Sequence, residues 1–186
     1  MLKIIKYILP KHLKNIIIFF PFLISKTDLN QVMILKFLSG FVIFSMITSL
    51  IYITNDFIDI KNDRSNELKK KDNIGKYFNK FSIIFSIFFL IPIFIFADFL
   101  ELFSVHLILY VMFFYFYTLK GKYIKFIDLL LLNSFYILRL LYGCDLINVE
   151  ISIWFLIFFS TLFFILSIFK KLIKIKINKL NKSNNV

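Results

Sequence analysis

Long apolar runs separated by short polar stretches dominate the pattern of this chain. Five of these runs are each close to the roughly 20 residues that a helix needs to cross the hydrocarbon core of a membrane. They cover residues 37–55, 81–97, 102–119, 129–144 and 151–169. We therefore expect an all-α fold, a polytopic bundle of transmembrane helices.

A sixth apolar run, residues 15–25, is only half a span by itself and contains Pro21. It becomes long enough if the helix starts near Lys11 and the lysine side chains extend to the membrane surface. We count about six spans in one transmembrane domain, residues 1–173. A basic, Asn-rich tail follows, residues 174–186, which we expect to be solvated and to lie against anionic lipid.

The placement of the positive charges predicts which loops face the cytoplasm. With the N-terminus in the cytoplasm, the cytoplasmic segments contain 20 of the 23 Lys and Arg residues, as the positive-inside rule requires. These segments are residues 1–14, 56–80, 120–125 and 170–186. The pattern predicts a multi-pass protein of a bacterial inner membrane. The amino-acid composition is rich in Phe, Ile, Lys and Asn, which is typical of an AT-biased coding sequence. Part of the net charge of +12 can therefore reflect coding bias, and we expect no nucleic-acid partner.

Three carboxylates follow the second of these spans at helical spacing. Asp56, Asp59 and Asp63 are separated by three and four residues, which places them on one face of a helix. Like charges on one face repel each other unless a cation lies among them, and carboxylates with substrate phosphates are the usual ligands of Mg²⁺. We predict that these three residues bind Mg²⁺ and act in catalysis. The alternative is a solvated helix end with ordinary surface acids.

Basic side chains near the predicted cytoplasmic surface are candidates for binding phosphate. Arg64, Lys69 and Lys70 follow the acidic motif directly. Lys120 is expected to reach a phosphate as a point charge, with Tyr117 donating a hydrogen bond to the same group. The alternative for the last two is a routine interfacial tyrosine beside a lysine that extends to the membrane surface.

Asp128 and Arg139 are a further pair of candidate substrate-binding residues. They are eleven residues apart, so they share one helical face at a separation of about 16 Å along the axis. They cannot contact each other, but both can line one cavity. An arginine at that depth must face protein or water, and the alternative is a buried structural arginine satisfied by neighbouring carbonyls.

Residues 55–64, N-D-F-I-D-I-K-N-D-R, resemble the N-D-x-x-D-x-x-x-D-R signature of the UbiA-type intramembrane prenyltransferases. Residues 14–21 resemble the K-N-x-x-x-F-x-P opening of the branch that contains decaprenyl-phosphate phosphoribosyltransferase, and residues 117–120, Y-T-L-K, are similar to its Y-S-L-K. Residues 128–143 and 154–156 look like the fifth and sixth helices of that branch. The resemblance covers essentially the whole chain.

The resemblance implies a Mg²⁺-dependent membrane transferase that acts on polyprenyl lipids or their phosphates and on a diphosphate substrate. In the closest branch a phosphoribosyl group is transferred to polyprenyl phosphate, and in the other branch a prenyl group is transferred to an acceptor. Such enzymes form a bundle that typically has nine helices, of which this chain would supply the N-terminal two-thirds. Asn55 and Lys14 would join the substrate-binding residues by position in the motifs.

The chain also departs from the family pattern. Asp72 replaces an arginine after the acidic motif, both prolines of that segment are lost, and the chain stops about three helices early. The alternative function is therefore a non-catalytic remnant or subunit, paired with itself or with a separately encoded C-terminal half. A CDP-alcohol phosphotransferase is disfavoured, because only Asp59 and Asp63 fit its spacing. His106 and Cys144 are expected to be structural.

Overall fold

The computed structural model describes residues 13–24, 30–58 and 81–183, and every regular element in these ranges is a helix. The elements are η1 (Leu13–Ile18), α2 (Phe19–Ile24), α3 (Gln31–Ile58), α6 (Phe81–Phe99), α7 (Val105–Leu119), η3 (Gly121–Tyr123), α8 (Lys125–Ile147) and α9 (Ile153–Ser183). The predicted all-α class is confirmed. Each predicted apolar run coincides with a helical segment, and the first run forms η1 followed directly by α2.

The described helices identify the protein as an α-helical membrane bundle. Three segments are long and apolar enough to cross a membrane, namely Gln31–Asp56, Phe126–Ile147 and Ile153–Ile173. Three shorter apolar helices accompany them within the described ranges, at Leu13–Ile24, Phe88–Phe99 and Val105–Leu119.

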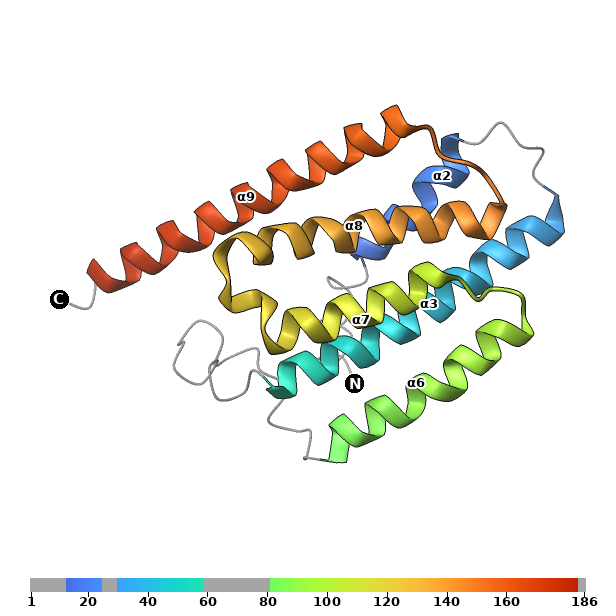
Figure 1. Cartoon of the computed structure of the whole chain (residues 1–186), viewed down its shortest axis with the longest axis horizontal. Helices are drawn as coiled ribbons and strands as arrows, with labels where there is room; N and C mark the ends of the chain where they lie inside the picture. Colours follow the sequence, from blue (N-terminus) through green and yellow to red (C-terminus); the bar gives the residue numbers. More distant parts are fainter. Residues whose placement is uncertain (1–12, 25–29, 59–80, 184–186) are drawn as a thin grey trace.

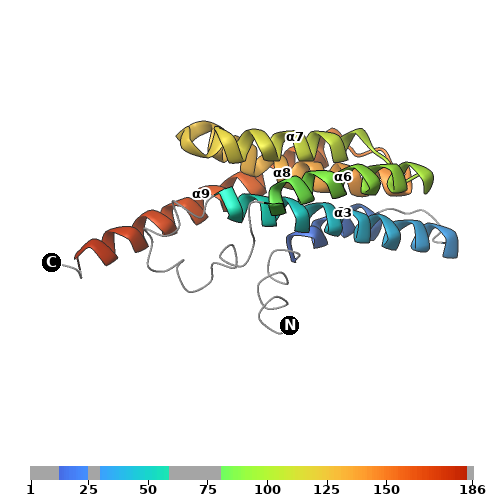
Figure 2. The same cartoon turned by 90° about the horizontal axis from the view of Figure 1, so that it is seen from below.

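The centre of the bundle is formed by α3, α7 and α8, which lie against one another (Figure 1). Helix α6 packs against α3 on one side, and α9 packs against α8 on the other. The short η1 and α2 lie across α8. Figure 2 shows that the C-terminal part of α9 extends past the other helices. This helix continues without a break through the first part of the predicted tail, to Ser183.

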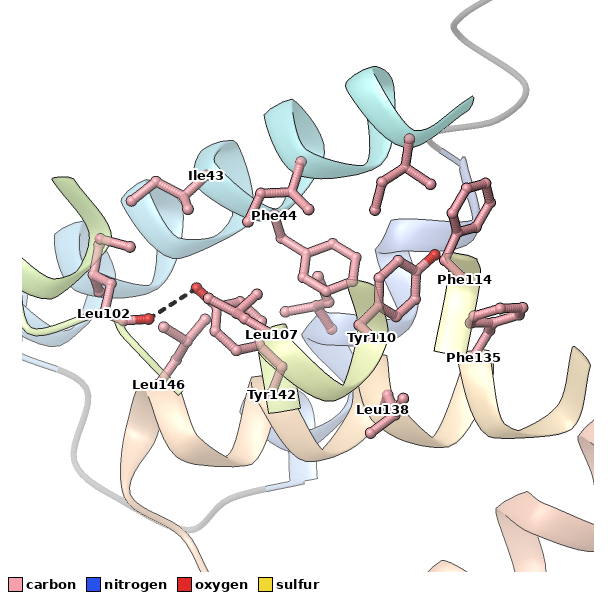
Figure 3. Close-up of a cluster of buried hydrophobic side chains, with 14 of the residues drawn as sticks. Ile43, Phe44, Leu102, Leu107, Tyr110, Phe114, Phe135, Leu138, Tyr142 and Leu146 are labelled. Atoms are coloured by element: carbon pink, nitrogen blue, oxygen red, sulfur yellow. Dashed lines mark hydrogen bonds between the residues drawn. The ribbon is translucent and has the colours of Figure 1, made fainter. Parts of the chain in front are cut away.

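The central helices meet in a core of apolar and aromatic side chains (Figure 3). Phe44 of α3 packs edge-on against Tyr110 of α7, with ring centroids 4.9 Å apart, and stacks on Tyr142 of α8 at 5.4 Å. The Tyr142 hydroxyl donates to the carbonyl oxygen of Leu102. Large apolar side chains on the outer faces, such as Trp154, are exposed and suit contact with lipid.

Helix η1 approaches α8 closely because a glycine faces it. A Cβ atom added at Gly143 would lie 2.3 Å from the carbonyl oxygen of Ile18, which is a backbone atom that cannot rotate away. The absence of a side chain there lets η1 pack backbone to backbone on α8. This contact determines where the polar residues of η1 lie relative to α8.

Candidate substrate-binding site

A cavity of about 200 Å³ lies between η1, α3, α7, α8 and α9. Four of the predicted substrate-binding residues line it, although they are far apart in the sequence: Lys14, Asn55, Tyr117 and Arg139. The other lining residues are Tyr52, Tyr110, Phe114, Leu132, Phe135, Tyr136, Leu166, Ser167 and Lys170. The cavity therefore combines basic groups with a wall rich in tyrosine.

Arg139 lies at the centre of this site and is 2% exposed. Its Nε donates to Oδ1 of Asn15 at 3.1 Å, and its NH1 group donates to the carbonyl oxygen of Phe135 at 2.8 Å. Its NH2 group donates to the hydroxyls of Tyr52 at 3.2 Å and Tyr110 at 2.5 Å. The expectation that this arginine faces protein rather than lipid is confirmed.

All of these partners of Arg139 are neutral. The guanidinium carbon also lies 5.0 Å from the ring centroid of Tyr110, 5.7 Å from that of Tyr136 and 5.9 Å from that of Phe44, within the range of cation–π attraction. Hydrogen bonds and aromatic faces stabilise a buried cation, but they do not cancel its charge. No carboxylate is found among the described residues that line the cavity.

Two lysines add to this positive charge. Lys14 of η1 and Lys170 of α9 both line the cavity, and their side chains meet there. Lys14 also lies close enough to Arg139 for the two charges to interact. Like charges held this close repel each other, and an anion among them would relieve that repulsion. The geometry therefore suits an anionic group, and a phosphate matches both the point charge of a lysine and the donors of an arginine.

Asn55 connects this cavity to the acidic motif. Its Oδ1 accepts a hydrogen bond from the hydroxyl of Thr118 at 3.3 Å, which ties the last turns of α3 to the last turn of α7. Asp56 is the next residue and is half-buried. The first carboxylate of the motif thus follows a residue that lines the basic cavity.

The remaining predicted residues of the acidic motif and its basic cluster, Asp59, Asp63, Arg64, Lys69 and Lys70, lie outside the described residues. Within residues 13–24, 30–58 and 81–183, no group of three His, Cys, Asp or Glu side chains is placed to hold a metal ion. The donor chemistry of Asp56 and Asn55 is nevertheless the oxygen chemistry that Mg²⁺ prefers.

Two predicted residues lie away from the cavity. Lys120 follows the last turn of α7 and is exposed, and it is not among the residues that line the cavity. Asp128 lies one turn before the lining residue Leu132 on α8. Its Oδ2 accepts a hydrogen bond from Nζ of Lys171 at 2.8 Å. The spacing of Asp128 and Arg139 had allowed both to line one cavity, but only Arg139 lines this one.

Several residues of the site were not predicted as substrate-binding. Asn15 is fully buried, and besides accepting from Arg139 it donates to the hydroxyl of Thr48 at 3.0 Å. Tyr52, Tyr110 and Tyr136 surround the guanidinium. The sequence did contain a signal that could have identified these residues, namely hydrogen-bonding side chains inside apolar runs. Buried amides and tyrosine hydroxyls need polar partners, so such side chains are expected to meet one another.

A second polar cluster lies at the opposite ends of α7 and α8. Nδ1 of His106 and Oδ2 of Asp145 are 2.6 Å apart, and Ser104 donates a hydrogen bond to the same carboxylate. The hydroxyl of Ser104 also caps α7 by accepting from the backbone N–H of His106 at 3.1 Å. Both His106 and the buried Cys144 occupy positions that suit a structural role, as expected.

Comparison with models of known protein families and with proteins of curated function finds no match to this chain.

Proposed function

We propose that the protein is a Mg²⁺-dependent membrane transferase of the UbiA type that acts on a polyprenyl lipid or its phosphate and on a diphosphate substrate. The proposed reaction is that of the closest branch, transfer of a phosphoribosyl group to polyprenyl phosphate. The acidic motif and the basic cavity would be on the cytoplasmic side of a bacterial inner membrane, as the distribution of lysines and arginines favours.

One observation supports this proposal above the others. Lys14, Asn55, Tyr117 and Arg139 come from separate motifs of the resemblance and from four different elements, yet they line one cavity. A chance similarity of short motifs gives no reason for their side chains to converge. The excess of positive charge in that cavity fits a substrate whose reacting part carries phosphate.

In this reaction an oxygen of the lipid phosphate attacks the anomeric carbon of phosphoribosyl diphosphate. The new bond joins that oxygen to the carbon, the bond from the carbon to the diphosphate oxygen breaks, and diphosphate leaves with the electron pair. Lys14 and Arg139 would bind phosphate oxygens and orient them, and Tyr117 would donate a hydrogen bond to the same group. The apolar faces of the helices would surround the polyprenyl chain.

Asp56, with Asp59 and Asp63, would hold Mg²⁺, and Asn55 would orient the group beside them. The metal, when bound, neutralises charge on the departing diphosphate. The fixed hydrogen bond from Thr118 leaves the amide nitrogen of Asn55 as the donor for a substrate oxygen.

A non-catalytic remnant or subunit is the second candidate, and one observation favours it. The bonds to Asn15, Phe135, Tyr52 and Tyr110 use four of the five N–H donors that a guanidinium carries. Arg139 is therefore already satisfied as the structural centre of a stable bundle, without a substrate. Pairing with itself or with a separately encoded C-terminal half belongs to this candidate.

The proposal is tested by supplying the purified chain in mild detergent with Mg²⁺, radiolabelled phosphoribosyl diphosphate and polyprenyl phosphate. We expect label to enter the lipid extract only when Mg²⁺ is present. Binding of Mg²⁺–pyrophosphate, measured by calorimetry, should weaken by tenfold or more in Asp56→Asn, on the order of 1.4 kcal/mol.

The matched control is Asp98→Asn, which removes an equally acidic but exposed side chain at the far end of α6. It should leave the binding of pyrophosphate unchanged. Equal losses in both variants would mean that only the total surface charge matters. Binding without transfer would favour the non-catalytic candidate.

A further inference from the structure

The side-chain amide of Asn15 contacts α3 and α8 at once, although Asn15 itself belongs to the short helix η1. It is fully buried. Its Oδ1 accepts a hydrogen bond from Nε of Arg139 on α8 at 3.1 Å. Its Nδ2 donates to two hydroxyls of α3, that of Thr48 at 3.0 Å and that of Ser45 at 3.3 Å. The amide therefore joins α3 to the buried arginine.

The hydroxyl of Thr48 determines which way this amide faces. A threonine hydroxyl carries one hydrogen and two lone pairs. In Thr48 the hydrogen is donated to the carbonyl oxygen of Ser45, three residues earlier in α3, at 3.0 Å. Towards Asn15 the hydroxyl can then only accept, so it selects the NH2 side of the amide. The oxygen side is left for Arg139, whose guanidinium carries donors only.

The opposite orientation of the amide would break its contact with Arg139. It would place the NH2 group of Asn15 against the Nε–H group of the guanidinium, donor against donor. Both side chains are buried, so water does not replace the lost partner, and a buried donor without an acceptor is costly. The orientation that Thr48 selects is therefore the one that holds the guanidinium in place.

One face of α3 acts on two edges of this guanidinium. Thr48 and Tyr52 are one helical turn apart, so they share that face. The hydroxyl of Tyr52 accepts from the NH2 group of Arg139 at 3.2 Å, while Thr48 acts on the Nε edge through Asn15. Asn55, seven residues after Thr48, continues the same face and lines the cavity.

The burial of Asn15 also sets the direction of its neighbour Lys14. Helix η1 is a 3-10 helix, in which three residues complete one turn, so consecutive side chains project about 120° apart. With Asn15 held between α3 and Arg139, Lys14 projects to another side of η1. There it lines the cavity.

We propose that Thr48 is a positioning residue for phosphate binding: its hydroxyl orients the amide of Asn15, which holds Arg139 and Lys14 at the cavity for a phosphate or diphosphate group. Thr48 is not among the described residues that line the cavity. It therefore acts through Asn15 and not on the substrate. This inference rests on the proposed function, because it assumes that the cavity takes a phosphate.

The competing explanation is a buried hydrogen bond that only adds stability. Substitutions at two adjacent positions of α3 separate the two explanations. Thr48→Val removes the hydroxyl and keeps the shape of the side chain, and Ile47→Val shortens a fully buried apolar side chain. Both should lower the stability measured by thermal unfolding in detergent, but only Thr48→Val should weaken the binding of a phosphate.

The orientation of Asn15 is measured directly at Nε of Arg139. The chain has two arginines, Arg64 and Arg139. Isotope-labelled arginine therefore gives two Nε–H signals in NMR spectra of the full chain in detergent, and Arg64→Lys assigns them. In Thr48→Val we expect hydrogen exchange at Nε of Arg139 to become about three- to tenfold faster, the range for the loss of one buried hydrogen bond. Thr48→Ser should retain the slow exchange, because serine supplies the same hydroxyl.

The affinity of the full chain is measured for two probes, inorganic pyrophosphate and farnesyl phosphate. The first reports on a free phosphate group, and the second on a phosphate carried by a lipid. We expect Thr48→Val to weaken the binding of at least one probe by about three- to tenfold, and the identity of that probe shows which source the site accepts. Thr48→Ser should bind like the original chain.

Thr161→Val is the matched control for the loss of a threonine hydroxyl. Thr161 is exposed on α9, and its hydroxyl also donates to the carbonyl oxygen three residues earlier, at 2.9 Å. This variant should change neither the exchange at Arg139 nor the affinity. If Thr48→Val does not fold, Ser45→Ala replaces it in both measurements, because it removes the other acceptor of Nδ2 of Asn15.

The outcomes distinguish this inference from the proposed function. If Thr48→Val leaves the exchange or the affinity unchanged, or if Ile47→Val weakens binding equally, Thr48 is not a positioning residue. Binding by the original chain would then leave the proposed function standing. If the original chain binds neither probe, the proposed function fails together with this inference.

Discussion

Polar side chains gather towards both ends of α7 and α8, and the two clusters differ in how their charges are balanced. At one end, His106, Asp145 and Ser104 contact one another, so the carboxylate of Asp145 meets a histidine and a hydroxyl at once. At the other end, Lys14, Lys170 and Arg139 share a cavity without a carboxylate among its described lining residues. In the first cluster a carboxylate meets its partners directly, and in the second, positive groups predominate among the described lining residues.

The first cluster closes the fold, and on the proposed function the second would bind the substrate. The Ser104 cluster joins neighbouring helix ends and caps α7, so its contacts explain all three residues. The hydrogen bonds of Arg139 join η1, α3, α7 and α8, which explains its position. On the proposed function, the two lysines that line the cavity beside it would bind the phosphate of the substrate.

The largest effect is expected from Gly143→Ala, which disturbs the packing of η1 on α8 that brings Asn15 to Arg139. A methyl group there would lie 2.3 Å from the carbonyl oxygen of Ile18, so η1 must move away from α8. The bond between Asn15 and Arg139 depends on that approach. We expect a loss of about 1–3 kcal/mol in unfolding free energy, measured by thermal unfolding in detergent, and weaker binding of pyrophosphate.

Gly40→Ala is the matched control for this variant. The added methyl group would lie 2.5 Å from Cδ2 of Leu146, which is the end of a flexible side chain and can rotate. Stability should fall by less than in Gly143→Ala, and pyrophosphate affinity should not change. An equal loss of affinity in both variants would contradict the view that binding depends specifically on the position of η1.

An intermediate effect is expected when a carboxylate is placed beside Arg139. In Asn15→Asp, a carboxylate oxygen takes the place of Oδ1 and accepts from Nε of Arg139. The substitution also removes the amide donor to Thr48, so thermal unfolding must show that the variant is folded. The positive charge of the cavity is partly neutralised. We expect about tenfold weaker binding of pyrophosphate, equivalent to about 1.4 kcal/mol, by calorimetry.

Asn148→Asp makes the same chemical change at the exposed residue that follows α8, at the other end of the bundle. It should not alter the affinity for pyrophosphate. Unchanged affinity in Asn15→Asp as well would contradict the view that the positive charge of Arg139 and the lysines attracts the ligand.

The smallest effect is expected from Asp145→Asn in the balanced cluster. His106 and Asp145 are 28% and 38% exposed, so water screens the contact between them. Partly exposed pairs contribute about 0.2–1 kcal/mol, and we expect a loss of stability in that range by thermal unfolding. Pyrophosphate affinity should stay the same, and a marked decrease would mean that the two ends are coupled.

Much of the fold could be predicted from the sequence, because the signal that determines it is local. The runs at 81–97 and 102–119 coincide with α6 and α7 to within a few residues, since apolar segments of that length in a membrane must satisfy their own backbone as helices. The run at 15–25 does not form the single α-helix that the sequence predicted. It begins as the 3-10 helix η1 and continues as α2, which contains Pro21. The close packing of η1 on Gly143 of α8 is a tertiary contact that the local pattern does not contain.

The site could be predicted only in part. The sequence pointed to Lys14, Asn55, Tyr117 and Arg139, and these four converge in the structure. Spacing along α8 could not show that Asp128 pairs with Lys171, because the partner is on another helix and the rotation of that helix is a tertiary property. For the same reason, the sequence could not show that Lys170 lines the cavity.

The sequence by itself determined that this chain is a bundle of membrane helices and that Arg139 must face the protein interior, because apolar length and the cost of a charge in lipid are local properties. Only the tertiary structure decided which groups share a charge environment. Whether a lysine pairs with the carboxylate of another helix, as Lys171 does, or lines a cavity together with Arg139, as Lys170 does, depends on distances between helices. Electrostatic energy depends on those distances in space and not on separation along the chain.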